Sequence, residues 1–238
     1  RATRLDRAAA LALQRSLLPD RPLPIPGLDL ASRYLPGNDV GVGGDWYDLF
    51  VLPNGHIGVT IGDVAGSGLR AAVVMGRIRS ALRAYALETL DPADVLTRLD
   101  HKILVFEPEA MATVLYAVIA PDHASMTVSN AGHMPPVLRR PGEPNRLLWL
   151  PADAPVGAFP ATPRQTTSHA VPDGGALLFY TDGLVEVRGH SVIDGIEQLA
   201  EGLAGDSADA LCLSAITTML ADREATDDVA LLALRRTR

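Results

Sequence analysis

Strand-like segments occur in runs along this chain, and helix-like segments occur in adjacent pairs. Periodic apolar residues predict one pair of helices over about 68–87 and 91–106, and a second pair over about 193–203 and 208–220. Turn sequences join most of the intervening strand-like segments directly. Strands joined by hairpins favour antiparallel sheets over a parallel sheet with crossover helices. The order therefore predicts an α+β fold.

The strands are predicted from alternating apolar and polar residues and from the turn residues between them, and one further helix is predicted at the start of the sequence. Predicted strands cover residues 28–35, 46–52, 56–63, 112–119, 125–130, 136–140, 146–150, 165–171, 176–181 and 229–234. Residues 2–18 predict an amphipathic helix that ends at Pro19. This helix either packs on its own domain or continues from an upstream module. Because the sequence opens with Arg1 in the middle of a helical pattern, we expect a longer polypeptide.

Composition limits the classes of partner. The chain has 238 residues, of which 47% are hydrophobic, and this is enough for one sizeable core. A formal net charge of -7 disfavours binding to nucleic acid or to anionic lipid. No apolar run reaches the length of a membrane helix, so we expect no membrane contact from this segment. The single cysteine, Cys212, lies in an apolar run, as expected for a buried thiol in a cytoplasmic protein.

One predicted hairpin places a carboxylate at the end of an apolar row. Alternation puts Asp63 on the same strand face as Ile57, Val59 and Ile61. If the hairpin loop is the three residues 53–55, Asp45 lies directly opposite Asp63. A two-residue loop would place Trp46 there instead. A buried, ionised carboxylate is costly unless it is paired or binds a metal.

Further acidic residues lie at the ends of apolar strands. Asp182 follows one such strand, and Asp227 and Asp228 precede another. Each of these positions, taken singly, is also ordinary turn chemistry. Converging carboxylates repel unless a hard cation holds them, and oxygen-only ligands favour Mg²⁺, Mn²⁺ or Ca²⁺. Zinc is disfavoured because the six histidines form no closely spaced pair and the chain has one cysteine.

Six motifs occur in order along the chain, at intervals that fit a known family. They are LQRSLLP (13–19), GGDWYD (43–48), GDVAGSG (62–68), AGHMPP (131–136), YTDGLVE (180–186) and DDVALL (227–232). Together they resemble the bacterial SpoIIE/RsbU branch of the metal-dependent protein phosphatases, the protein phosphatase 2C-like superfamily. The GGD run alone also suggests a diguanylate cyclase, but the residues after it and the order of strands and helices do not fit that enzyme.

The resemblance implies a four-layer αββα sandwich, in which two antiparallel sheets are flanked by helix pairs. It also implies a site for two Mn²⁺ or Mg²⁺ ions, with a third ion left open. Carried over, Asp63 bridges both ions and the backbone carbonyl of Val64 completes one of them. Asp182 and Asp227 hold the other ion, and Asp45 assists as a catalytic or metal-binding residue. Asp228 ranks lower because its position is often Asn in relatives.

The implied activity is metal-dependent hydrolysis of phosphoserine or phosphothreonine in a protein. By analogy the substrate is a phosphorylated anti-sigma-factor antagonist in a partner-switching pathway. Residues 1–20 then form a regulatory linker helix that carries a signal from an upstream sensory domain, and residues 21–238 form the catalytic domain. A variant of this interpretation has the helix hold the enzyme inactive. A homodimer is left open.

Some positions depart from the family pattern. Relatives often have His where this chain has Ser67. Because Ser67 directly precedes the helix predicted over 68–87, we interpret it as an N-cap in preference to a catalytic or substrate-binding hydroxyl. No arginine precedes GGDWYD closely, and Arg33 is the nearest candidate for binding phosphate, with a loop-anchoring role as its alternative. His133 either approaches the substrate or fixes its own loop. These departures keep open a second hypothesis, a pseudophosphatase that docks a regulator without turnover.

Overall fold

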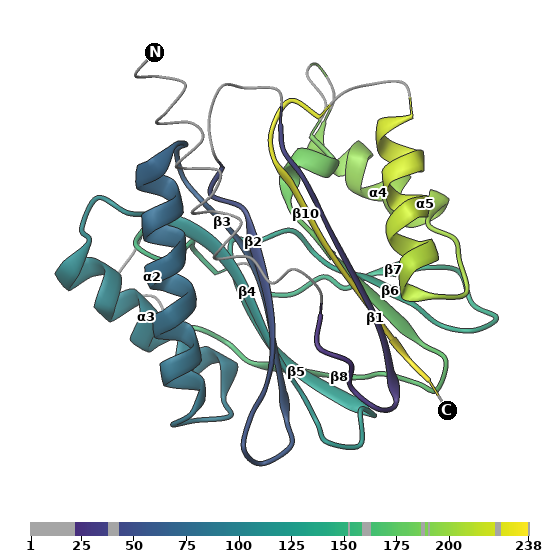
Figure 1. Cartoon of the computed structure of the whole chain (residues 1–238), viewed down its shortest axis with the longest axis horizontal. Coiled ribbons are helices and arrows are strands. Elements are labelled where there is room, and N and C mark those ends of the chain that lie inside the picture. The colour runs from purple at the N-terminus through teal and green to yellow at the C-terminus, as the bar shows by residue number, and fades with distance from the viewer. Residues whose placement is uncertain are drawn as a thin grey trace. The chain divides into compact units, whose positions relative to one another are not determined.

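Figure 1 shows the computed structural model of the chain. The structure describes residues 22–37, 43–151, 153–158, 163–186, 189, 191–221 and 225–237. These residues form two compact units, each built from separate stretches of chain. Unit 1 comprises the described residues of 40–133 and 150–170, and unit 2 those of 21–39, 134–149 and 171–238. The helix predicted over 2–18, and with it the linker 1–20, lies outside the described residues.

Unit 1 contains an antiparallel five-stranded sheet with the strand order β2-β3-β4-β5-β8. The strands are β2 (Trp46–Val51), β3 (Ile57–Val64), β4 (Ala112–Ile119), β5 (Ser125–Ala131) and β8 (Thr167–Ala170). Short turns join β2 to β3 and β4 to β5, as the hairpin signals predict. The long crossing from β3 to β4 contains the two helices of the unit.

The helices α2 (Leu69–Ala86) and α3 (Pro92–Phe106) contact each other and cover one face of this sheet (Figure 1). Helix α3 starts at a favourable sequence, because Asp91 accepts a hydrogen bond from the backbone N–H of Ala93 and Pro92 occupies the first helical position. Alternate residues of β4 face the helices, and Tyr116 among them is fully buried. The apolar row of β3 that ends at Asp63 lies on the opposite face of the sheet, and its members are also buried.

Unit 2 contains the second antiparallel five-stranded sheet, with the order β1-β10-β9-β6-β7. The strands are β1 (Leu28–Leu35), β6 (Val137–Arg139), β7 (Arg146–Leu147), β9 (Ala176–Tyr180) and β10 (Val229–Arg236). A short 3₁₀ helix, η1 (Asp182–Leu184), follows β9. Helices α4 (Val192–Gly202) and α5 (Ala208–Leu220) pack on this sheet, and both start at a serine that caps the helix.

The predicted α+β class is confirmed, because each antiparallel sheet carries one of the two predicted helix pairs. The predicted strands are all present, although β7 is shorter than the segment 146–150 suggests. Among the described residues, no helix combines the length and the apolar character that crossing a membrane requires.

Candidate metal and phosphate site

The register of the β2–β3 hairpin settles the position of Asp45. Trp46 pairs with Gly62, and the pairing continues because the N–H of Val64 donates to the carbonyl of Gly44 at 3.2 Å. The loop is the three-residue alternative, closed by a hydrogen bond from the N–H of Leu52 to the carbonyl of His56. Asp45 therefore lies directly opposite Asp63, as the three-residue loop predicts.

The two carboxylates of this pair are close, and one of them is almost inaccessible. A carboxylate oxygen of Asp45 lies within 4.8 Å of one of Asp63, and Asp45 is 2% exposed. Two like charges this close in a poorly solvated place destabilise each other. A divalent cation bound by both would remove that repulsion. The pair, which offers only oxygen ligands, therefore fits a hard cation such as Mg²⁺, Mn²⁺ or Ca²⁺.

Gly44 allows the backbones of β2 and β3 to approach at this end. A Cβ atom on Gly44 would lie 2.3 Å from the carbonyl oxygen of Val64. Any larger residue would therefore displace that oxygen, which is the one that the family resemblance assigns to a metal. Unit 1 thus brings Asp45, Asp63 and the Val64 carbonyl to one end of the hairpin.

Unit 2 places Asp182 and Asp227 near the ends of neighbouring strands, where their charges interact. Asp182 starts η1 directly after β9, and Asp227 lies two residues before the neighbouring strand β10. Burial raises the pKa of Asp182 above the usual aspartate range, and the negative charges of Asp227 and Glu186 raise it further. Gly183 follows Asp182 and packs against the backbone next to Asp227. Only glycine fits at this position, because a Cβ on it would lie 2.1 Å from the carbonyl oxygen of Asp228.

Asp228 has a different role from its neighbour. Its side chain accepts hydrogen bonds from the Tyr34 hydroxyl and, at 2.7 Å, from the N–H of Gly37. It is 4% exposed, whereas Asp227 is exposed. Asp228 therefore fixes the end of β1 and the segment that follows it. These contacts join residues far apart in the sequence, and no local pattern predicts them.

His133 and Arg33 are engaged in contacts within their own units. His133 Nδ1 lies 2.9 Å from Thr113 Oγ1, and the His133 backbone exchanges two hydrogen bonds with the Asn130 side chain. Arg33 forms an ion pair with Asp209 of α5 and donates to its neighbour's carbonyl. These contacts fit the loop-fixing alternative for His133 and the anchoring alternative for Arg33. Thr113, the β4 partner of Asp63, is a residue that the sequence does not single out.

Ser67 does not cap α2, contrary to the sequence-based interpretation. Gly68 occupies the N-cap position with φ of 83°, and no side chain supplies a capping hydrogen bond. Glycine is favoured there because it adopts positive φ without strain. Ser67 therefore lies one residue too early to cap the helix, and its side chain is exposed.

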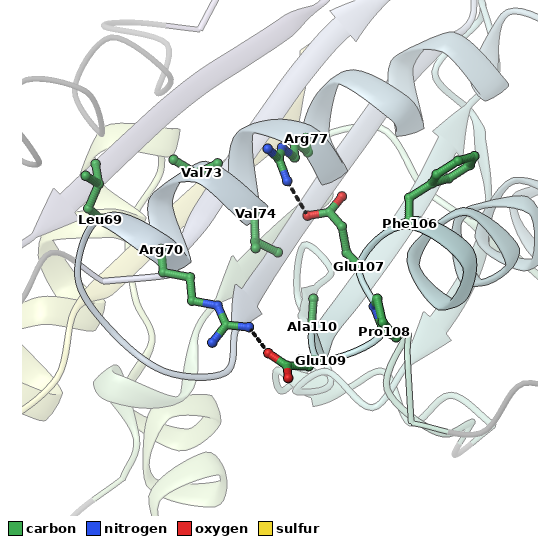
Figure 2. Close-up of a pocket in the computed structure, with 10 residues that line it drawn as sticks. All are labelled: Leu69, Arg70, Val73, Val74, Arg77, Phe106, Glu107, Pro108, Glu109 and Ala110. Atoms are coloured by element: carbon green, nitrogen blue, oxygen red, sulfur yellow. Dashed lines mark hydrogen bonds and ion pairs between the residues drawn. The ribbon is translucent and has the colours of Figure 1, made fainter.

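A cavity of about 710 Å³ lies in unit 1 beside the first half of α2 (Figure 2). None of the predicted site residues lines it. Its two arginines are committed to glutamates across the cavity, Arg70 to Glu109 at 2.5 Å and Arg77 to Glu107 at 3.2 Å. The positive charges of this cavity are therefore already neutralised, and its other lining residues are apolar. Such a lining is poorly suited to bind a phosphate group.

Comparison with known proteins finds phosphatases among the relatives of this chain. The chain is 28% identical over 148 residues to the phosphoserine phosphatase RsbP of Bacillus subtilis, covering 60% of this chain and 36% of RsbP. It is 26% identical over 234 residues to RsbU of the same organism, also a phosphoserine phosphatase, covering 95% of this chain and 69% of RsbU. The protein IcfG of Synechocystis sp. is 30% identical over 178 residues. That match covers 62% of this chain but 27% of IcfG, so the chain spans only a minor part of the length of IcfG and of RsbP.

Solved structures share the fold. The crystal structure of the RsbU and RsbW domains of Rv1364c from Mycobacterium tuberculosis has a TM-score of 0.80 and 31% identity, over 90% of this chain and 61% of that one. The PP2C phosphatase domain of SpoIIE from Bacillus subtilis has a TM-score of 0.72 at 18% identity, over 88% of this chain and 62% of that one. A family model described as Stage II sporulation protein E (SpoIIE) matches residues 53–237. Since that match covers most of the sequence, the chain belongs to the SpoIIE family.

Proposed function

We propose that this chain is a metal-dependent protein phosphatase that hydrolyses phosphoserine or phosphothreonine. The observation that carries the proposal is the Asp45–Asp63 pair, two carboxylates in register at the end of a hairpin, one of them buried. The names of the Bacillus subtilis relatives support the same reaction class. A solved structure of similar fold, RsbX, is in complex with magnesium.

The proposed metal ligands lie at the ends of strands in each unit. Asp45, Asp63 and the Val64 carbonyl lie in unit 1, and Asp182 and Asp227 in unit 2. When bound, a pair of Mn²⁺ or Mg²⁺ ions lowers the pKa of a water molecule and offsets charge on the phosphoryl oxygens. The chain's own contribution is to fix the carboxylates in place before substrate arrives, which Gly44 and Gly183 allow by close backbone contact.

The physiological substrate that we propose is a phosphorylated anti-sigma-factor antagonist. This finer statement rests on the RsbU and RsbP relatives and on the structural neighbour that contains RsbU and RsbW domains. The phosphoserine or phosphothreonine of that protein would reach the end of the sheet where Asp63 lies. Regulation through residues 1–20 by an upstream sensory domain remains a prediction.

The alternative is a docking module of the same fold without turnover. Arg33 favours it, because its guanidinium is committed to Asp209, and no other arginine lies among the described residues 22–37 and 43–68 to bind a phosphate group. Calorimetric titration with Mn²⁺ separates the two functions, since a phosphatase of this class must bind the metal and a docking module need not.

The deciding experiment measures hydrolysis of p-nitrophenyl phosphate and of a phosphorylated antagonist protein across a Mn²⁺ titration. The wild type is compared with Asp63→Asn and with the control Asp122→Asn, which changes an exposed carboxylate in the turn after β4. We expect Asp63→Asn to lose about a thousandfold in rate, since the metals supply several kcal/mol of charge stabilisation. The control should match the wild type. No hydrolysis by any of the three proteins, with Mn²⁺ saturating, would favour the docking module.

A further inference from the structure

A buried ion pair joins α3 to the segment that leads into β8. The side chains of Asp100 and Arg164 are 5% and 2% exposed. Asp100 Oδ2 accepts from Arg164 Nε at 2.9 Å and also from Nη2, while Arg164 Nη1 donates to the carbonyl of Ala154 at 3.0 Å. Removing two charges from water costs free energy, and a buried ion pair is therefore weak evidence for a gain in stability. The structural role of this pair follows from its other hydrogen bonds.

The second oxygen of Asp100 holds a short segment that we name the strap, residues 153–157. Asp100 Oδ1 accepts the backbone N–H of Gly157 at 2.8 Å. Gly157 has φ of 82°, and a Cβ on it would lie 2.3 Å from the carbonyl oxygen of Ala110. The strap is thus pressed against the chain just before β4, and only glycine fits at the point of contact.

The strap is hydrogen-bonded to the start of β4, next to the proposed metal ligands. Val156 and Ala112 exchange two backbone hydrogen bonds, of 2.9 and 3.1 Å. Ala112 is the cross-strand partner of Val64, and the N–H of Ala65 donates to the carbonyl of Met111 at 2.9 Å. A displacement of the strap would therefore reach the end of β3 through a single strand.

The strap also supports the other side of Thr113, the cross-strand partner of Asp63. Asp153 forms a β-bridge with Ala131, and Pro155 lies so close to Gly132 that a Cβ there would come within 2.8 Å of it. This turn carries His133, which contacts the Thr113 hydroxyl. The strap thus supports the surroundings of Asp63 from two directions.

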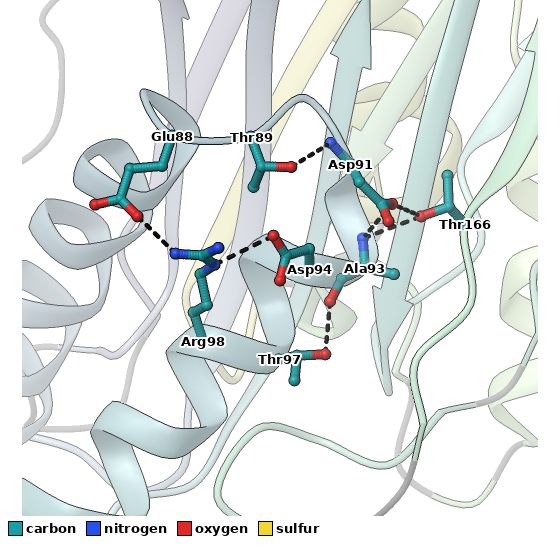
Figure 3. Close-up of polar contacts among 8 residues, drawn as sticks. All are labelled: Glu88, Thr89, Asp91, Ala93, Asp94, Thr97, Arg98 and Thr166. Carbon is teal, nitrogen blue, oxygen red and sulfur yellow. Dashed lines mark hydrogen bonds and ion pairs between the residues drawn. The ribbon is translucent and has the colours of Figure 1, made fainter.

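The residues around Arg164 are themselves tied down. The N–H of Gln165 donates to Asp153 Oδ2 at 3.1 Å, so this segment is fastened to the strap. Thr166 contacts Asp91 and accepts from the N–H of Ala93 at 3.0 Å, at the first turn of α3 (Figure 3). Helix α3 is therefore the anchor to which both the strap and the Arg164 segment attach.

We propose that Asp100, oriented by Arg164, is a positioning residue for the metal-binding end of β3. It acts through the Gly157 N–H and the Val156–Ala112 pair on Val64 and Asp63. The proposal rests on the proposed metal centre. It assigns to Asp100 a specific task, accepting one backbone N–H, that is separable from its charge.

The test compares two uncharged double variants, one that keeps that acceptor and one that lacks it. Asp100→Asn with Arg164→Met removes both charges and keeps a side-chain oxygen for the Gly157 N–H. Asp100→Leu with Arg164→Met removes both charges and the acceptor. Val95→Ala, a buried residue on the same helix, serves as a control for general loss of stability. Unfolding in urea verifies that each protein is folded under the conditions used.

The readouts are Mn²⁺ binding by calorimetry and amide hydrogen exchange of Ala65 and Ala112 in metal-free protein. We expect the Leu double variant to bind Mn²⁺ about 10- to 100-fold more weakly and to exchange faster at both amides. The Asn double variant and Val95→Ala should stay near the wild type. Equal Mn²⁺ affinity in the two double variants would overturn the proposal. If the wild type bound no Mn²⁺, the metal centre itself would fail, and equal exchange rates in the two double variants would then overturn the strap's role as well.

Discussion

Asp45 and Asp63 lie opposite each other one position beyond the Trp46–Gly62 pair, so that two carboxylates share the end of one hairpin. The next position, where Val64 donates to Gly44, closes the strand pairing behind them. This arrangement is unfavourable for a protein without a cation, because neither carboxylate can move away along its strand. The predictions below follow from it and from the contacts that support it.

Asp45→Asn should stabilise the metal-free protein while weakening metal binding. The substitution removes a like-charge repulsion on the order of 1–3 kcal/mol across about 5 Å. We expect a higher melting temperature than the wild type in EDTA, and a smaller increase on adding Mn²⁺. Thermal unfolding with and without Mn²⁺ measures both. A variant that is less stable than the wild type in EDTA would contradict the repulsion.

Gly44→Ala should disturb the same site without removing a charge. Its Cβ would lie 2.3 Å from the Val64 carbonyl oxygen, and neither backbone can yield without separating the strands. We expect weaker Mn²⁺ binding in calorimetry, together with a lower melting temperature. Gly142→Ala is the control for Mn²⁺ affinity, since its Cβ meets nothing within 4 Å, although its φ of 76° strains an alanine and lowers stability for a separate reason. Unchanged Mn²⁺ affinity in Gly44→Ala would show that the carbonyl position is unimportant.

Asp48→Ala should cost much more stability than the loss of an exposed ion pair. Asp48 is fully buried and is paired with two arginines of α2, Arg79 at 3.0 Å and Arg83 at 2.6 Å. Breaking a buried ion pair costs about 3 kcal/mol or more. Asp94→Ala, which breaks a half-exposed pair with Arg98, should cost about 0.5 kcal/mol or less. Urea denaturation of the two variants provides the comparison, and similar midpoints would refute it.

The thiol of Cys212 should be inert in the folded protein. Cys212 is fully buried, and burial raises its pKa to about 11. At pH 8 the group is therefore protonated as well as inaccessible, and thiolate is the reactive form. We expect no reaction with a thiol-specific reagent in the native protein. After a denaturant is added, one thiol per chain should react. Rapid labelling of the native protein would contradict the packing of α5.

The hairpin could be predicted because its information is local. The turn residues Pro53, Asn54 and Gly55 separate two alternating segments and so predict the hairpin, whereas the choice between a two- and a three-residue loop, which decides the partner of Asp63, comes from the structure. Capping serines and the Asp91–Pro92 pair likewise mark where helices begin. The candidate ligands could be named because each lies in a motif at the end of a strand.

The supporting contacts could not be predicted in the same way. Asp100 and Arg164 are 64 residues apart in the sequence, and nothing near either residue indicates the other. The two arginines that hold Asp48 are spaced four apart on α2, which indicates a shared helix face but not its partner. The N-cap of α2 is Gly68, one residue after the predicted Ser67, because capping signals in the sequence do not reveal that Gly68 adopts positive φ. Residues that position a site depend on tertiary packing, which short sequence patterns do not encode.

The pairing of β1 with β10 has a consequence for how the chain is made. Leu28 pairs with Arg236, so the sheet of unit 2 joins strands about 200 residues apart. At a synthesis rate of about 5–20 residues per second, β1 leaves the ribosome about 10–40 s before its partner is complete. During that interval its edge is exposed, and pairings of such long range also form slowly. Unit 1, whose hairpins are local, can begin to fold first, whereas β1 is open to pairing with other strands until β10 has been made.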